Sequence, residues 1–305
     1  MSSHPAGTRQ KKLFSQNDYL APLPLPTGQQ PVDSLNIIWR KNEVYLDIGC
    51  HSVGSAVMVI WPMIIFYLTL AYSFRNLIPQ LSIFMLIAGA VITGIPTLML
   101  IHGLLRPTPP PVRFNRQRRE VCVPRDNGEY WIVPWESVTA AATQCSSIGQ
   151  AGRVTTGLLF IGFENPDPEA SEDNKHFSMG FNCGGGETAM VLWECMRSYM
   201  EIGPEAVPES RVGAMPYEET QIGSIVTSVR KGDVFDVLHG LFFVTILGTY
   251  LAEKLQNLKL SPPPDLEYPD IVEWSKSLPP EQWTTRSAEL EIALARHEES
   301  QSINE

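Results

Sequence analysis

Two long apolar stretches set the hydrophobic pattern of this chain. The first runs from Ile48 to Phe74 and the second from Asn76 to Leu105; neither holds an Asp, Glu, Lys or Arg, and only Arg75 separates them. A helix needs about 20 mostly apolar residues to cross the hydrocarbon core of a bilayer. Residues 54–72 and 81–105 are each long enough for this. The pattern therefore predicts two membrane-spanning helices.

The two predicted spans form a hairpin over residues 48–105, because the connection at residues 73–80 is too short for anything but a turn. Arg40 and Lys41 come before the hairpin, whereas the connection holds Arg75 alone. Five arginines follow the hairpin: Arg106, Arg113, Arg116, Arg118 and Arg119. Because cytoplasmic flanks collect Lys and Arg, we expect both flanks, and the soluble part that follows them, on the cytoplasmic side.

A third apolar run, from Val237 to Ala252, lies within residues 232–257 and complicates this topology. Its 16 uncharged residues fall just short of spanning length. Asp233 and Asp236 lie at its start and disfavour insertion further. We predict a helix that lies in the membrane interface. The alternative is a third span, which would place the tail of the chain in the periplasm.

After the second span, short segments rich in Val, Ile, Phe, Tyr and Thr are separated by turn residues, a pattern typical of antiparallel strands. The predicted strands cover residues 112–115, 120–124, 130–133, 136–143, 155–163 and 176–181. Apolar residues then recur at helical spacing over residues 187–200. We therefore predict an α+β membrane protein in which the transmembrane hairpin is followed by a small antiparallel β-barrel or sheet domain, residues 110–205, closed by an amphipathic helix.

Two tryptophans flank Pro134 at the end of one predicted strand. Because proline interrupts the alternation of a strand, Trp131 and Trp135 are not expected to face the same side. We predict that Trp131 lies in the core with Val133 and that Trp135 is more exposed.

The two ends of the chain differ in composition. Residues 1–47 are predicted to be a cytoplasmic, largely disordered arm, because their prolines and polar residues cannot build a core. The tail, residues 261–305, holds ten acids and three bases, so most of the net charge of −10 resides there and a nucleic-acid partner is disfavoured. Trp274 and Trp283 are candidate anchors, either on the chain's own domain, which we slightly prefer, or on a protein partner. A last amphipathic helix is predicted at residues 285–299.

No catalytic, metal or nucleotide motif is found, and no cofactor is predicted. The five cysteines are widely spaced and lack a CxxC pair, so neither a zinc site nor a disulfide framework is expected. His176 has no partner nucleophile at a recognisable spacing. One basic cluster follows the hairpin: Arg113, Arg116, Arg118, Arg119 and Arg125. These side chains are candidates for contact with anionic lipid headgroups, although the same charges are needed merely to orient the second span.

Several segments resemble known bacterial proteins. Arg113–Arg116, Val121–Pro124 and Trp131–Glu136 resemble segments of bacterial pleckstrin-homology-like domains attached to membrane hairpins. More closely, the chain resembles an uncharacterised family of proteobacterial inner-membrane proteins, known as a domain of unknown function. This resemblance covers residues 35–285 and includes the tail motif Pro279–Trp283.

The resemblance implies a multi-pass protein of the bacterial inner membrane with a cytoplasmic pleckstrin-homology-like domain. Members of the family often lie beside type VI secretion genes, which implies an immunity or accessory role, and the family has no catalytic residues to carry over. Our first hypothesis is a membrane-anchored, non-enzymatic module that binds a protein partner. The alternative is a lipid-sensing envelope regulator whose domain contacts the bilayer.

Overall fold

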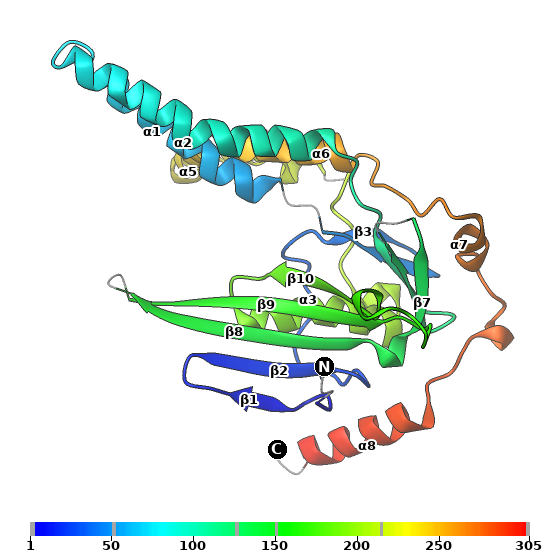
Figure 1. Ribbon diagram of the computed structural model, residues 1–305. Helices are drawn as coiled ribbons and strands as arrows, with labels where there is room; N and C mark the ends of the chain where they lie inside the picture. Colours follow the sequence, from blue (N-terminus) through cyan, green and yellow to red (C-terminus); the bar gives the residue numbers. More distant parts are fainter. Residues whose placement is uncertain (1–3, 51–52, 126–127, 150–151, 214–215, 303–305) are drawn as a thin grey trace. The chain divides into compact units, whose positions relative to one another are not determined.

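The computed structural model describes residues 4–50, 53–125, 128–149, 152–213 and 216–302 (Figure 1). The chain forms two compact units. The sheet unit comprises residues 1–50, 110–210 and 265–305, and the helical unit comprises residues 51–109 and 211–264. Each unit is therefore assembled from segments that lie far apart in the sequence.

Two antiparallel five-stranded sheets make up the sheet unit, in the orders β1-β2-β8-β9-β10 and β3-β4-β5-β6-β7. The strands of the first sheet are β1 (Arg9–Lys11), β2 (Ser15–Ala21), β8 (Thr139–Gly149), β9 (Gly152–Glu164) and β10 (His176–Asn182). Those of the second are β3 (Ile38–Lys41), β4 (Tyr45–Ile48), β5 (Val112–Asn115), β6 (Glu120–Pro124) and β7 (Tyr130–Pro134). Antiparallel strands are confirmed at every predicted segment, but among the described residues the sheets do not close into the predicted barrel.

The helical hairpin is inserted between two neighbouring strands of the second sheet. β4 and β5 pair antiparallel, with Ile48 opposite Val112. The residues between these strands form α1 (Gly54–Phe74) and α2 (Pro79–Leu105), which are both long and apolar enough to cross a membrane. Opposite residues of an antiparallel pair lie about 5 Å apart. Both ends of the hairpin are therefore joined to adjacent points of one sheet.

This arrangement corrects the predicted disordered arm at residues 1–47, of which residues 1–3 lie outside the described part of the chain. β1 and β2 belong to the first sheet, and β3 and β4 to the second. Ahead of β3, the carboxylate of Asp33 accepts hydrogen bonds from the backbone N–H groups of Ile37 and Ile38, at 2.9 and 3.0 Å. The prediction failed because β2 and β4 pair with strands far along the chain, which local composition does not reveal.

One helix, α3 (Gly186–Glu201), packs against β8 and β9 and covers one face of the first sheet (Figure 1). It is the predicted closing helix. Leu159, Ile161 and Phe163 point into the core that β9 shares with α3. Phe160 lies between them in the sequence and is 41% exposed, because successive side chains of a strand face opposite sides. The sheet therefore has one packed face and one open face.

Trp135 lies at the centre of the core. It is fully buried and stacks on Trp193 with ring centroids 5.4 Å apart. Its Nε1 donates to Oε1 of Glu201 at 2.8 Å. Trp131 is buried as predicted, but the prediction that Trp135 is more exposed is wrong. Pro134 ends β7, and the 3-10 turn that follows directs the Trp135 ring back into the core.

In the helical unit, α1 and α2 pack closely where Gly89 faces Tyr67. A Cβ atom added to Gly89 would lie 2.7 Å from the Cβ of Tyr67, so only glycine fits this approach. Few other residues of the two helices are enclosed. In each helix, 11% of the most apolar stretch of 18 residues is buried. The apolar surface of the hairpin is thus left largely uncovered by the chain itself.

The third apolar run is broken into two helices rather than the one that we predicted. The first comprises α5 (Val234–Phe242) and a π-helix (Phe243–Leu247) that continues it, and the second is α6 (Thr249–Leu260); α4 (Gln221–Lys231) precedes them. The helix axis bends by 66° between Leu247 and Thr249. Gly248 at the bend has φ +69°, a left-handed conformation that favours glycine.

From Asp265 onwards, the acidic tail belongs to the sheet unit. It contains α7 (Pro269–Trp274), a 3-10 turn (Pro280–Gln282) and α8 (Ala288–Ser302). α8 confirms the last predicted helix. The hydroxyl of Ser287 accepts a hydrogen bond from the backbone N–H of Leu290 at 3.1 Å and so caps its first turn.

Candidate functional site

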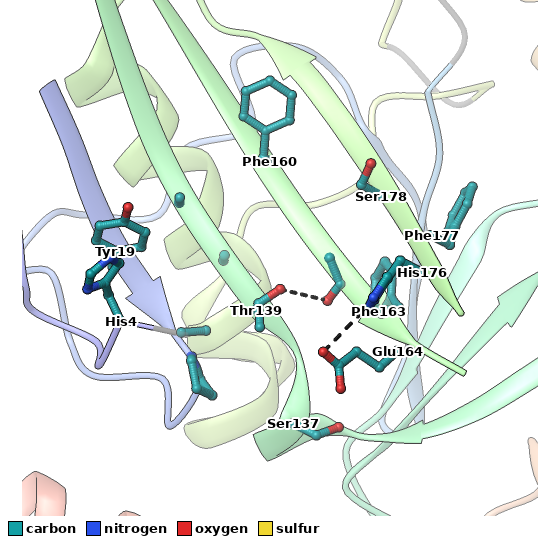
Figure 2. Close-up of a pocket in the computed structure, with 15 residues that line it drawn as sticks. His4, Tyr19, Ser137, Thr139, Phe160, Phe163, Glu164, His176, Phe177 and Ser178 are labelled. Carbon is teal, nitrogen blue, oxygen red and sulfur yellow. Dashed lines mark hydrogen bonds and ion pairs between the residues drawn. The ribbon is translucent and has the colours of Figure 1, made fainter. Parts of the chain in front are cut away.

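A pocket of about 460 Å³ lies on the open face of the first sheet (Figure 2). β2, β8, β9 and β10 supply most of its lining. Figure 2 shows His4 and Tyr19 on one side of the pocket and His176 on the other. The ring centroids of His4 and Tyr19 are 4.6 Å apart. The pocket therefore has aromatic and imidazole groups on both sides.

Small residues in the middle of the sheet make the hollow. Ala141 on β8 lies opposite Tyr19 on β2 and opposite Phe160 on β9. Gly162 lies opposite Thr139, and a Cβ atom at this glycine would meet Oγ1 of Thr139 at 2.5 Å. The rings of Tyr19 and Phe160 thus flank a floor with very short side chains.

The side of the pocket away from His4 and Tyr19 carries a second set of polar groups. His176 and Glu164 lie opposite each other in β10 and β9, and Nδ1 and Oε1 of these residues are 3.9 Å apart. Both side chains are more than half exposed. The hydroxyl of Ser137 donates instead to the carbonyl of Pro134 at 2.8 Å. This geometry suits a ligand that places an apolar side chain in the hollow and pairs a neighbouring basic group with the Glu164 carboxylate.

The five arginines of the predicted headgroup cluster lie in different surroundings. Nε and Nη2 of Arg113 donate to Asp47 at 2.6 and 2.8 Å, and Nη2 also donates to Asp265 at 2.6 Å. Burial alone would lower the pKa of Arg113, but the hydrogen bonds to Asp47 raise it above the ordinary value. Arg113 is 2% exposed. Its guanidinium is enclosed by the chain's own carboxylates, which contradicts the predicted headgroup contact.

Arg119 is likewise enclosed, which contradicts the headgroup contact predicted there. Its Nη2 donates to Glu201 at 2.7 Å and to Glu136 at 2.9 Å. Nε of Arg286, in the tail, donates to Glu201 at 2.7 Å. Burial acts to raise the pKa of Glu201, but the hydrogen bonds from Arg119, Trp135 and Arg286 outweigh it and hold that pKa below its ordinary value.

The other three arginines are partly exposed, and each contacts the sheet unit. Nε of Arg118 donates to the carbonyl of Trp274 at 3.0 Å. The guanidinium of Arg116 lies 5.3 Å from the ring centroid of Trp283. That of Arg125 lies between two aromatic rings, 4.5 Å from each centroid. A headgroup contact at these three positions stays a prediction.

The two tail tryptophans also differ. Trp274 is 8% exposed, its Nε1 donates to Glu120 at 2.7 Å, and its carbonyl accepts from Asn115 at 3.0 Å. The tail is thus packed on its own domain, as we preferred, and Trp274 is not placed for the alternative partner contact. Trp283 is 37% exposed and donates to the carbonyl of Leu278 at 3.0 Å. A partner contact at Trp283 stays a prediction.

Sequence reasoning missed the pocket. Part of its lining comes from residues 4–22, which the composition assigned to a disordered arm. The remainder comes from residues 137–178, which were assigned only as strands. One usable signal was Gly162 inside a long apolar strand, because an internal glycine often marks a close approach.

The chain matches no protein-family model, no curated protein and no solved structure. Among the residues that the structure describes, no group of three or more His, Cys, Asp or Glu side chains is arranged to hold a metal ion. The inserted hairpin and the pocket are therefore the features of the molecule that bear on its function.

Proposed function

We propose that the chain is a membrane-anchored, non-enzymatic binding protein whose sheet unit captures a protein partner in the pocket on its open face. In this proposal α1 and α2 span the bacterial inner membrane, and the sheet unit lies in the cytoplasm. The lengths of the two helices and the Lys and Arg residues on their flanks support this orientation.

The observation that carries the proposal is the insertion of the hairpin between β4 and β5. A hairpin that spans the bilayer returns its chain to the side from which it started. The pairing of Ile48 with Val112 requires that return, because both strands belong to one sheet. The strand pairing and the charge flanks thus both support the proposal that the ends of the hairpin lie on one side of the membrane.

The chemistry of the pocket defines the kind of partner. Aromatic side chains such as Phe160 and Tyr19, beside a floor of small residues, fit an aliphatic or aromatic side chain. Glu164 at the other end fits a Lys or Arg. The net charge of −10 favours encounter with a basic surface. We therefore expect the partner segment to combine an apolar anchor with a basic residue.

The more specific role that we propose is an immunity or accessory protein of a type VI secretion effector, which rests on the family resemblance alone. The lipid-sensing alternative rested on the arginine cluster. Because Arg113 and Arg119 are enclosed, we make that alternative an outcome of the test rather than a second proposal.

The test is affinity purification of the full chain from detergent-solubilised membranes of its native host, with mass spectrometry. Phe160→Ala removes the ring that flanks the pocket and should reduce partner recovery by about tenfold or more. Phe14→Ala is the matched control, because Phe14 is also exposed, at 54%, but lies outside the pocket. It should leave recovery unchanged.

Two results would contradict the proposal. Equal partner recovery with Phe160→Ala and with Phe14→Ala would show that the pocket is not the binding surface. Recovery of lipid alone in repeated trials would favour the sensing alternative. A secretion effector among the proteins lost with Phe160→Ala would support the specific role.

A further inference from the structure

The segment from α5 to the π-helix carries an apolar surface with no described cover. Its exposed apolar side chains are Val234, Phe235, Leu238, Leu241 and Phe242. We propose that residues 234–247 form a wedge that enters one leaflet of the bilayer and does not cross it. This wedge enters from the side on which both flanks of the hairpin lie. The inference rests on the proposed anchoring of α1 and α2 in the same bilayer.

The direction of α6 is fixed by its contacts with the hairpin. The bend at Gly248 packs on Trp61, and Ala252 lies beside Gly54, where a Cβ would be 3.9 Å from the Ala252 Cβ. Further along, Nζ of Lys259 donates to the carbonyl of Arg106 at 2.8 Å. α6 therefore runs from inside the hairpin towards the end at which α1 begins and α2 stops. Figure 1 shows α6 beside the hairpin.

These contacts also set the depth of the bend. Trp61 lies seven residues beyond Gly54, the first residue of α1, which corresponds to about 10 Å along a helix. The hydrocarbon core is about 30 Å thick. The bend at Gly248 thus lies within one leaflet, and α6 leads back out on the side from which α1 entered.

α4, which precedes α5 in the chain, is also short compared with the thickness of the hydrocarbon core. α4 begins beside α6, because Oε1 of Gln221 accepts from Thr249 at 2.8 Å and the N–H of Gln221 donates to Glu253 at 2.8 Å. Its 11 residues correspond to about 16 Å of helix, roughly half of the hydrocarbon core. α4 ends with Arg230 and Lys231, which suit a position at anionic headgroups. A complete crossing by α5 and α6 would need α5 to begin, and therefore α4 to end, on the opposite side of the hydrocarbon core.

Contacts at the bend between the π-helix and α6 suit an apolar environment. A helix that stops in lipid leaves carbonyl groups without hydrogen-bond donors, and each such group is costly there. Nε1 of Trp61 donates to the carbonyl of Thr245 in the π-helix at 2.8 Å. A Cβ on Gly248 would lie 2.8 Å from the Trp61 ring. The same tryptophan therefore packs on the bend and satisfies one of its carbonyls.

The test measures depth in vesicles of phosphatidylcholine and phosphatidylglycerol that contain the full chain. A fluorescent nitrobenzoxadiazole label is attached to a single introduced cysteine, in a chain where the exposed Cys50 and Cys145 are replaced by serine. Lipids with a doxyl quencher high or low on the acyl chain then report depth. Phe242→Cys is the test position, Ile92→Cys in α2 is the deep reference, and Leu13→Cys in the sheet unit is the aqueous reference.

The wedge predicts greater loss of fluorescence with the shallow quencher than with the deep one at position 242, and the reverse at position 92. Position 13 should lose no fluorescence with either quencher. Stronger deep quenching at position 242 would overturn the inference in favour of a third span. Quenching at position 92 with none at position 242 would overturn the wedge, whereas the proposed placement of α1 and α2 in the bilayer would still hold. No quenching at position 92 would refute the anchor itself.

Discussion

The sheet unit and the helical unit handle apolar residues in opposite ways. Eleven of the 16 residues of α3 are buried inside the sheet unit. In α1, whose sequence is far more apolar, three of 21 residues are buried. A helix that is apolar on all sides without a protein core around it needs another apolar surrounding. The sheet unit thus encloses its apolar residues, whereas α1 and α2 are long and apolar enough to cross a membrane and leave most of theirs exposed.

Charged groups follow the same division. The sheet unit encloses ion pairs, among them Arg113 with Asp47 and Arg119 with Glu201. The helices α1 and α2 contain no Asp, Glu, Lys or Arg. Buried pairs are costly to break, because removal of one partner leaves an uncompensated charge. The units should therefore respond very differently to the same kind of substitution, and the following predictions exploit this.

The largest effect is expected for Trp135→Ala in the sheet unit. It removes a fully buried ring that packs on Trp193 and a hydrogen bond to Glu201. We expect a loss of about 3 to 5 kcal/mol in the free energy of unfolding. The measurement is chemical unfolding of the detergent-solubilised chain, followed by circular dichroism. Ile92→Ala removes an exposed apolar side chain of α2 and should cost less than about 1 kcal/mol. Equal losses of unfolding free energy for Trp135→Ala and Ile92→Ala would contradict the expected difference between the two units.

Arg113→Ala should be nearly as damaging, because Asp47 is then left buried without its bidentate partner. The expected loss is about 3 to 5 kcal/mol. Arg75→Ala, in the exposed turn between α1 and α2, should change stability by less than about 0.5 kcal/mol. A small effect at Arg113 would mean that this pair contributes little to the fold.

Gly248→Ala tests the bend of the helical unit. The new side chain would adopt φ +69° and meet the Trp61 ring, so we expect a cost of about 1 to 3 kcal/mol. Gly94→Ala is the control, since nothing lies within 4 Å of its Cβ position. Should both variants unfold at the same temperature as the parent chain, the bend is not held by these contacts.

The smallest effect concerns pH. The folded-state pKa of Glu201 is lowered, so its charge adds stability that is present above the unfolded pKa of about 4.3 and is lost as pH falls through the folded value. Glu201→Gln should destabilise the chain at neutral pH, and the difference from the parent should narrow below about pH 4. The control is the exposed Glu205→Gln. A pH-independent difference would contradict this role.

The sequence predicted the fold best where interactions are local. The strands from β5 to β10 and α3 were found, because alternation and turn residues act over a few positions. β1 to β4 were missed, since β2 pairs with β8 and β4 with β5 across long separations. The carboxylates of Asp47, Asp265 and Glu201 approach the arginine cluster only in the folded chain. For that reason Arg113 and Arg119 were mistaken for surface residues.

We propose that α1 and α2 lie in a bilayer while the sheet unit folds in water. Density-gradient flotation of membranes from cells that express the full chain, after an alkaline carbonate wash, tests it most directly. The chain should float with the lipid. Recovery of the chain as a folded, lipid-free protein in the carbonate supernatant would contradict the placement of α1 and α2 in a bilayer, because their apolar surfaces would then be covered by protein instead.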